Sequence, residues 1–210
     1  SIKRRLSLSE LLPFWFQIGK NLSGKEIWNE KGANNPFVAR CRKLIQDRDR
    51  VEVGPLLIHF FQSHFEGIFC PRPKDSEYQG FRLSDQEKIS QNPYLELLNI
   101  GALLIRSLFV EFHDNTLTLL PCLPKELHAG RFIGIKVTQD LLVDMEWSKK
   151  MLKRVIFYPQ KERRLQLSLQ KDLRFFRLSC GSKQQGKKLS VDEPLYLEKG
   201  RRYLLDRLIK

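Results

Sequence analysis

The stretch Leu117-Thr-Leu-Leu-Pro-Cys-Leu-Pro-Lys-Glu-Leu127 divides this 210-residue sequence into two halves. Apolar residues before it recur at helical spacing, and those after it alternate at strand spacing. Its first four residues predict a strand that ends at Pro121, because proline lacks the N–H group that a sheet needs. The sequence therefore predicts an α+β fold, with a helical region over residues 1–115 and an antiparallel β-sandwich over residues 116–210.

The first half has the apolar periodicity of amphipathic helices. Its helical segments are predicted at residues 10–21, 37–46, 56–69 and 94–112, of which the last has the longest signal. Residues 70–93 contain several prolines and predict a long loop, whose role the sequence leaves open. The third segment carries His59 and His64. Five positions put these side chains roughly 140° apart on a helix, so they indicate histidines packed in the core rather than a shared metal site, and we expect neither a metal nor a cofactor.

The second half has the period-two alternation of strands. A tight turn is predicted at Ser148-Lys-Lys150 and a polar turn over residues 181–186. Apolar residues alternate with polar ones around Ile135, Val143, Phe157, Leu167, Leu178 and Tyr203. Connections this short between successive strands predict antiparallel hairpins. A small β-sandwich follows from this pattern.

The four cysteines are scattered and form no C-x-x-C pair (Cys41, Cys70, Cys122 and Cys180). This usage predicts buried free thiols in a reducing compartment. The N-terminus has no signal-peptide pattern, and no apolar run is long enough for a membrane-spanning helix. We therefore expect a cytoplasmic location, unless the chain, which lacks an initiator Met, is a processed fragment.

The formal net charge of +13 is concentrated in the second half of the chain. Residues 1–115 carry 16 Lys and Arg against 14 Asp and Glu, whereas residues 116–210 carry 21 against 10. Such an excess attracts polyanions, such as nucleic acid or acidic glycans. The alternative is a solvated surface whose lysines prevent strands from pairing edge to edge. The candidate polyanion-binding cations are Lys149, Lys150, Lys153, Arg154, Arg163, Arg164, Lys187 and Lys188.

Several motifs follow one another in a fixed order along residues 94–210. Around the 117–127 stretch lie Asn99-Ile-Gly-Ala102, Gly130-Arg-Phe-Ile-Gly134, Val143-Asp-Met-Glu-Trp147 and Leu197-Glu-Lys-Gly-Arg-Arg-Tyr203. Their order and intervals resemble the C-terminal part of glycoside hydrolase family 95, the α-L-fucosidases. The resemblance implies carbohydrate substrates and an (α/α)6 barrel followed by a β domain. Residues 1–115 hold too few helices for a barrel, so the rest of a longer parent protein or a second chain would complete it.

The resemblance also indicates a degenerate catalytic loop. In the family an Asp that assists the catalytic base stands two residues before the position of Asn99, where this chain has Leu97. Leucine cannot transfer a proton, so we expect this chain alone to be inactive. Glu96 is the alternative carboxylate, although an acid in the first turn also stabilises a helix by itself. Tyr94 and Asn99 are candidate substrate-binding residues.

Two further functions remain open alongside a glycoside hydrolase. One is a non-catalytic carbohydrate- or protein-interaction module that keeps the scaffold and uses the basic β domain. The other is a protein that binds nucleic acid or another polyanion, although no RNA-binding motif is present. The sequence contains none of the phosphate-loop, dinucleotide-binding, zinc-protease or serine-hydrolase motifs that would favour another enzyme class.

Overall fold

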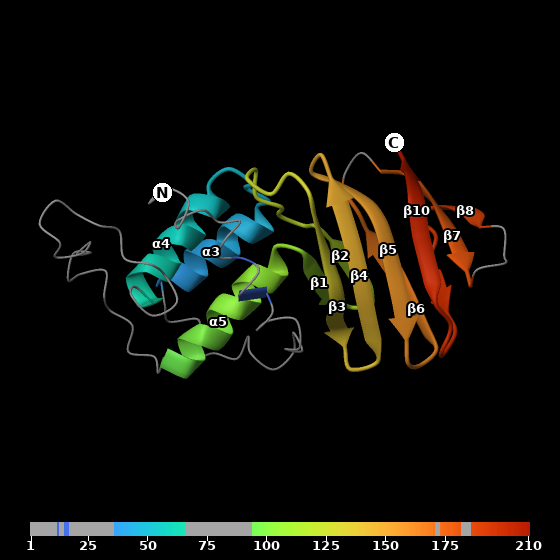
Figure 1. Ribbon diagram of the computed structural model, residues 1–210, viewed down its shortest axis with the longest axis horizontal. Coiled ribbons are helices and arrows are strands. Elements are labelled where there is room, and N and C mark those ends of the chain that lie inside the picture. Colours follow the sequence, from blue (N-terminus) through green and yellow to red (C-terminus); the bar gives the residue numbers. More distant parts are fainter. Residues whose placement is uncertain (1–11, 13–14, 17–35, 66–93, 171–172, 182–185) are drawn as a thin grey trace, which may run out of the picture.

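The computed structural model describes residues 12, 15–16, 36–65, 94–170, 173–181 and 186–210. Three helices in this part of the chain lie at one end of the molecule and the strands at the other, as Figure 1 shows. They are α3 (Pro36–Gln46), α4 (Val53–Phe65) and α5 (Tyr94–Ser107). Helix α5 leads directly into the first strand, so it is the element through which the two halves meet.

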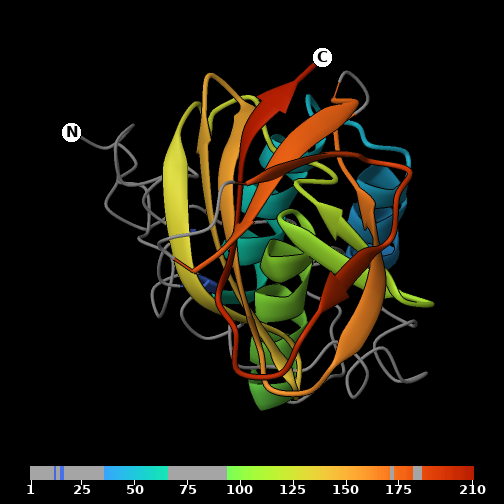
Figure 2. The ribbon, with the colours of Figure 1, turned by 90° about the vertical axis from the view of Figure 1, so that its right-hand side faces the viewer.

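The strands form two sheets that face each other (Figure 2). The smaller sheet has the order β1-β2-β6-β9, from Val110–His113, Thr116–Leu119, Arg163–Ser168 and Leu195–Leu197. The larger has the order β3-β4-β5-β10-β7-β8, from Gly130–Thr138, Leu141–Ser148, Met151–Pro159, Tyr203–Ile209, Phe175–Cys180 and Lys187–Ser190. The prediction of a mostly antiparallel β-sandwich is confirmed. One pair differs, because β2 and β6 run parallel.

The helix predicted over residues 94–112 is wrong at its C-terminal end. Helix α5 ends at Ser107, and residues 110–113 form strand β1, before the expected boundary at residue 115. The amides of Leu108 and Phe109 donate to the carbonyls three residues earlier, which tightens the last turn. Val110 then pairs with Leu119 of β2. Apolar spacing alone cannot distinguish this short strand from a further helical turn, because both bury the same residues.

Two tight turns connect strands through residues with positive φ. Asp114 and Asn115, at 46° and 61°, join β1 to β2, and Lys149 and Lys150, at 52° and 61°, join β4 to β5. Positive φ at both central residues is the geometry of a type I′ hairpin turn, whose twist matches that of the strands. The first turn uses residue types that tolerate this geometry readily, whereas lysines do so less well. The predicted turn at residues 148–150 is confirmed.

An aromatic cluster connects the helical end to the larger sheet. Phe16, Phe109, Phe132 and Trp147, here called the aromatic joint, have ring centroids 3.5–5.7 Å apart in the contacting pairs. The Trp147 indole N–H also donates to the carbonyl of Leu127 at 3.2 Å. Such pairs add to the stabilisation that burial itself provides. The joint lies within one continuous apolar core that includes residues of both halves.

Other predicted elements differ in how far the structure describes them. The second and third predicted helices correspond to α3 and α4, and His59 of α4 is half-buried. In the first predicted helix, residues 12, 15 and 16 are helical and buried, and its other residues lie outside the described set, as do residues 70–93. Strand β8 was not predicted, because Lys187-Lys188-Leu189 offers almost no apolar alternation.

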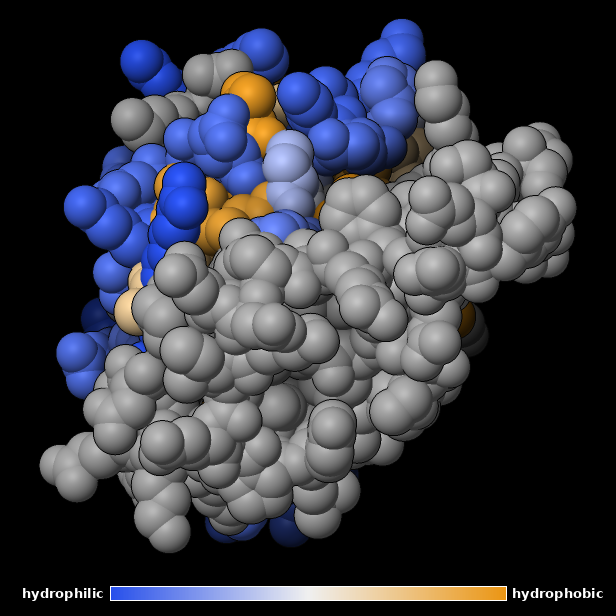
Figure 3. Space-filling model, turned by 90° about the vertical axis from the view of Figure 1, so that its left-hand side faces the viewer, coloured by the Kyte–Doolittle hydropathy of each residue, from blue (hydrophilic) through white to orange (hydrophobic). Residues whose placement is uncertain are grey.

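None of the described helices is long and apolar enough to cross a membrane. Figure 3 shows the end of the molecule that carries the helices, where the described residues are mostly hydrophilic with a few hydrophobic side chains between them. The large apolar side chains of the described residues are instead mainly in the core.

Candidate functional site

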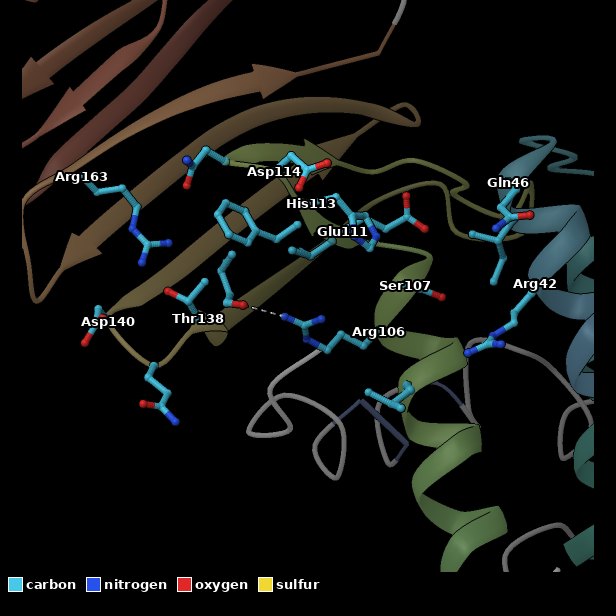
Figure 4. Close-up of a pocket in the computed structure, with 17 residues that line it drawn as sticks. Arg42, Gln46, Arg106, Ser107, Glu111, His113, Asp114, Thr138, Asp140 and Arg163 are labelled. Atoms are coloured by element: carbon cyan, nitrogen blue, oxygen red, sulfur yellow. Dashed lines mark hydrogen bonds between the residues drawn. The ribbon is translucent and has the colours of Figure 1, made fainter. Parts of the chain in front are cut away.

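A cleft of about 940 Å³, lined by both polar and apolar side chains, lies where the helices meet the two sheets. Helices α3 and α5 form one side of it, and strands β1, β3 and β6 with their turns form the other (Figure 4). We call it the junction cleft. It is lined by Arg42, Ile45, Gln46, Leu103, Arg106, Ser107, Val110, Glu111, Phe112, His113, Asp114, Asn115, Val137, Thr138, Gln139, Asp140 and Arg163.

Three buried polar atoms that line the junction cleft have no hydrogen-bond partner among the described residues: Arg106 Nε, Thr138 Oγ1 and Arg163 Nη1. We refer to these three residues as the donor wall. They come from α5, β3 and β6, elements distant in sequence that the sandwich brings together. Figure 4 shows both guanidinium groups reaching into the space between these elements. Native proteins satisfy most buried polar groups, so three unsatisfied ones around the same cleft make it the candidate site.

Arg106 is the most buried member of the donor wall, with 5% of its surface exposed. Its Nη2 group donates to the carbonyl oxygens of Lys136 and Val137 at 2.8 and 3.4 Å, which fixes the side chain against β3. Burial lowers the pKa of Arg106 to about 10, so the group stays charged at neutral pH. No described carboxylate lies within ion-pair distance of it.

Arg163 and its neighbour Arg164 lie on opposite faces of β6. Arg163 is half-buried and its guanidinium lies 5.4 Å from the ring centroid of Phe112, whereas Arg164 is exposed. The period-two alternation of a strand causes this difference. The two arginines, both candidate polyanion-binding cations, therefore have different environments.

The acidic groups of the junction cleft lie apart from Arg106. Burial raises the pKa of Glu111, and the neighbouring His113 and Arg48 oppose that rise. Asp140 forms an ion pair with Lys161 at 3.4 Å, and Asp114 is exposed in its turn. The cleft therefore offers cationic donors at the donor wall and carboxylate acceptors elsewhere. A hydroxyl group can donate to such acceptors.

The sequence-predicted catalytic and substrate-binding residues lie at the other end of α5. Tyr94 and Glu96 belong to its first turn, and their side chains are outside the described set. Asn99 is half-buried and does not line the junction cleft. The helical rise of 1.5 Å per residue separates it from Arg106 by about 10 Å along the axis. The structure thus does not bring these candidates to the donor wall.

The remaining candidate cations are exposed but distributed over the β domain. Lys149 and Lys150 occupy the β4–β5 turn, with Lys153 and Arg154 following on β5. Arg164 belongs to the other sheet, and the last two cations, on β8, lie at an edge of the larger one. Lys188 there lies 4.4 Å from the ring centroid of Phe175. Several local groups result, rather than one continuous patch.

The described cysteines are free. Cys41 and Cys122 are buried and Cys180 is half-buried, and burial raises the pKa of the first two to about 12 and about 11. Such thiols are inert at neutral pH because the thiolate is the reactive form. Within the described ranges, no group of three or more His, Cys, Asp or Glu is arranged to hold a metal ion.

Sequence reasoning missed Arg106 and Thr138 as site residues. The sequence contained one signal for Arg106, which is a charged residue within the mostly apolar run from Ile100 to Val110. A charge in such a run is expected to be buried with its neighbours. Thr138 gave no signal, because threonine is ordinary in strands. The convergence of β3, β6 and α5 depends on the sheet order, which local patterns do not contain.

Within the second half, residues 112–205 match the family model for glycoside hydrolase family 95, C-terminal domain. This match confirms the resemblance that the motifs indicated. A comparison with curated proteins finds no match.

Proposed function

We propose that the chain is the C-terminal portion of an α-L-fucosidase-like glycoside hydrolase whose catalytic loop is degenerate. The observation that supports this proposal is the family match over residues 112–205, which helix α5 precedes directly in the chain. In this proposal α3, α4 and α5 contribute to an (α/α)6 barrel, and the rest of a longer parent protein or a second chain completes it.

The degenerate loop follows from Leu97, which stands where the family has an acidic residue. An inverting glycosidase needs a general acid and a general base on opposite sides of the bond that it cleaves. Replacing a base-side carboxylate by leucine removes a proton acceptor. The chain by itself is therefore expected to leave α-L-fucosides intact.

The test is an assay of the purified 210-residue chain with a chromogenic α-L-fucoside. We expect no release above that of a blank, with circular dichroism showing that the protein is folded. Turnover that Glu96→Gln abolishes would contradict the proposal and assign the base role to Glu96. An Asn99→Ala variant, assayed in parallel, would then distinguish substrate binding from chemistry, because losing a binding residue raises KM.

The interaction-module alternative predicts glycan binding without turnover. It shares the scaffold with the first proposal, and the junction cleft supports it as a place where a ligand fits. A glycan array probed with the inactive chain separates these two functions. Selective binding favours the interaction module, and the absence of binding favours the portion of a glycoside hydrolase.

The exposure of most of the basic candidates favours weak polyanion binding as a second candidate function. Binding of this kind is salt-sensitive, because each neutralised phosphate releases counterions. We expect Lys149→Asn/Lys150→Asn to elute from heparin at lower salt than wild type, since asparagine tolerates the positive φ of this turn. The control Arg40→Gln/Lys43→Gln removes the same charge from exposed positions of α3. Equal elution of the two variants removes the β4–β5 turn from this function.

A further inference from the structure

The donor wall has a charge that the described protein does not balance. Arg106 is almost completely buried and Arg163 is half-buried, and neither forms an ion pair with a described carboxylate. Each also keeps a buried N–H without an acceptor, Nε of Arg106 and Nη1 of Arg163. Leaving such donors unpaired destabilises a fold. A bound acceptor would remove that cost at both residues.

The geometry selects the kind of acceptor. Guanidinium groups present their N–H donors in a planar fork that matches the oxygens of a carboxylate or a phosphate. Two of them reach into one cleft from α5 and β6, as Figure 4 shows. Arg106 is held in place by the backbone of β3, so little conformational freedom is lost when it binds.

The rest of the junction cleft indicates the chemistry of the part of the ligand that lies away from the donor wall. Glu111, Asp114 and Asp140 line it and offer carboxylate oxygens, and Gln139 and Asn115 offer amides. All of these groups can accept hydrogen bonds from hydroxyls, and the three carboxylates would repel a second anionic group. The cleft volume of about 940 Å³ is within the range of sites for small molecules.

We propose that the junction cleft binds a small hydroxylated ligand with one oxyanion, a sugar acid or a sugar phosphate, whose charged group lies between Arg106 and Arg163. Thr138 contributes its hydroxyl to the same group. This site lies about 10 Å along α5 from Asn99, so it is separate from Glu96 and Leu97 in the first turn of the helix and does not depend on the fucosidase-like proposal.

The test is isothermal titration calorimetry of the full chain at constant ionic strength. The three probes are glucuronate, glucose 6-phosphate and glucose. We expect saturable one-to-one binding of glucuronate or glucose 6-phosphate, with glucose at least tenfold weaker because it lacks the oxyanion. Comparison of the two charged probes identifies whether a carboxylate or a phosphate is preferred.

Matched variants assign the binding to the donor wall. Arg163→Gln should weaken the better probe roughly tenfold or more, because it removes a charge-assisted hydrogen bond. Arg164→Gln removes the same charge from the adjacent, exposed position and should leave affinity unchanged. Arg106→Lys keeps the charge but loses Nε–H and should also weaken binding. If Arg106→Lys unfolds, Arg163→Gln still decides.

Three results would overturn the proposal. One is the absence of saturable binding of both charged probes to wild type. Another is equal affinity for glucose and the charged probes. The third is equal affinity of Arg163→Gln and Arg164→Gln, which would place the anion on the general surface charge instead.

Discussion

The two sides of the junction between helices and sheets are built differently, although α5 contributes to both. On one side Phe109, which follows α5, packs against Phe132 and Trp147 in the aromatic joint. On the other side, Arg106 of α5 donates a hydrogen bond to the backbone of β3 and lines the junction cleft, where the polar atoms of the donor wall remain unsatisfied. The first arrangement stabilises the attachment of the helices. The second arrangement lowers the stability of the fold, because its buried donors have no partner, and such a loss of stability is typical of residues retained for binding.

The largest effect is expected on the aromatic side. Trp147→Ala should lower the free energy of unfolding by about 3–5 kcal/mol, because it leaves a cavity between two rings and removes the hydrogen bond to Leu127. Urea denaturation measures the change. Tyr196→Ala is the control, because that ring is 59% exposed and should change stability by less than about 0.5 kcal/mol. Equal losses in the two variants would mean that the joint does not hold the halves together.

A smaller, pH-dependent effect tests whether the apolar packing extends to α3. Cys41 is buried on α3, and Cys122 lies 3.8 Å from the carbonyl of Leu44 on the same helix. Their folded pKa values, about 12 and about 11, are above the unfolded value of 9.0, so the unfolded chain loses these protons first as the pH rises. Stability is therefore complete below pH 9 and falls above it, by at most about 1.4 kcal/mol per pH unit for each thiol.

The measurement is urea denaturation between pH 8 and about pH 10. Cys41→Ala/Cys122→Ala should show a flatter fall with pH than wild type, whatever its absolute stability. Cys180→Ala, at a half-buried position, is the control. A double variant with the wild-type slope would show that solvent reaches these thiols.

The contrast between the two sides also explains what the sequence could predict. Local periodicity was sufficient for most strands and for α3 and α4, because apolar spacing reports which face of an element is buried. It failed at Val110–His113, where tertiary pairing with β2 decides between helix and strand. It also failed at β8, whose polar residues form an edge.

The candidate site was less accessible to sequence reasoning than the fold. Arg163 was predicted only as one of eight polyanion-binding cations, and its place in β6 makes it half-buried beside the junction cleft whereas Arg164 is exposed. The junction cleft exists because three elements distant in the chain converge. The prediction at Leu97 came from the motif around Asn99, which lies before the residues 112–205 that match the family model. A local motif can be compared with a family position by position, whereas the residues that line a cleft between elements are scattered along the chain and form no motif.

The central claim is that the donor wall serves binding rather than stability, and the stability of Arg163→Met without ligand tests it most directly. Methionine keeps the length and apolar contact of the arginine stem but has no buried donor to satisfy. The account predicts a free energy of unfolding equal to that of wild type, or higher by up to about 1 kcal/mol, since the half-buried arginine keeps one buried N–H without an acceptor and methionine has no such donor to desolvate. A loss of more than about 2 kcal/mol in urea denaturation, the size expected for breaking a buried polar network, would contradict it and make Arg163 a structural residue.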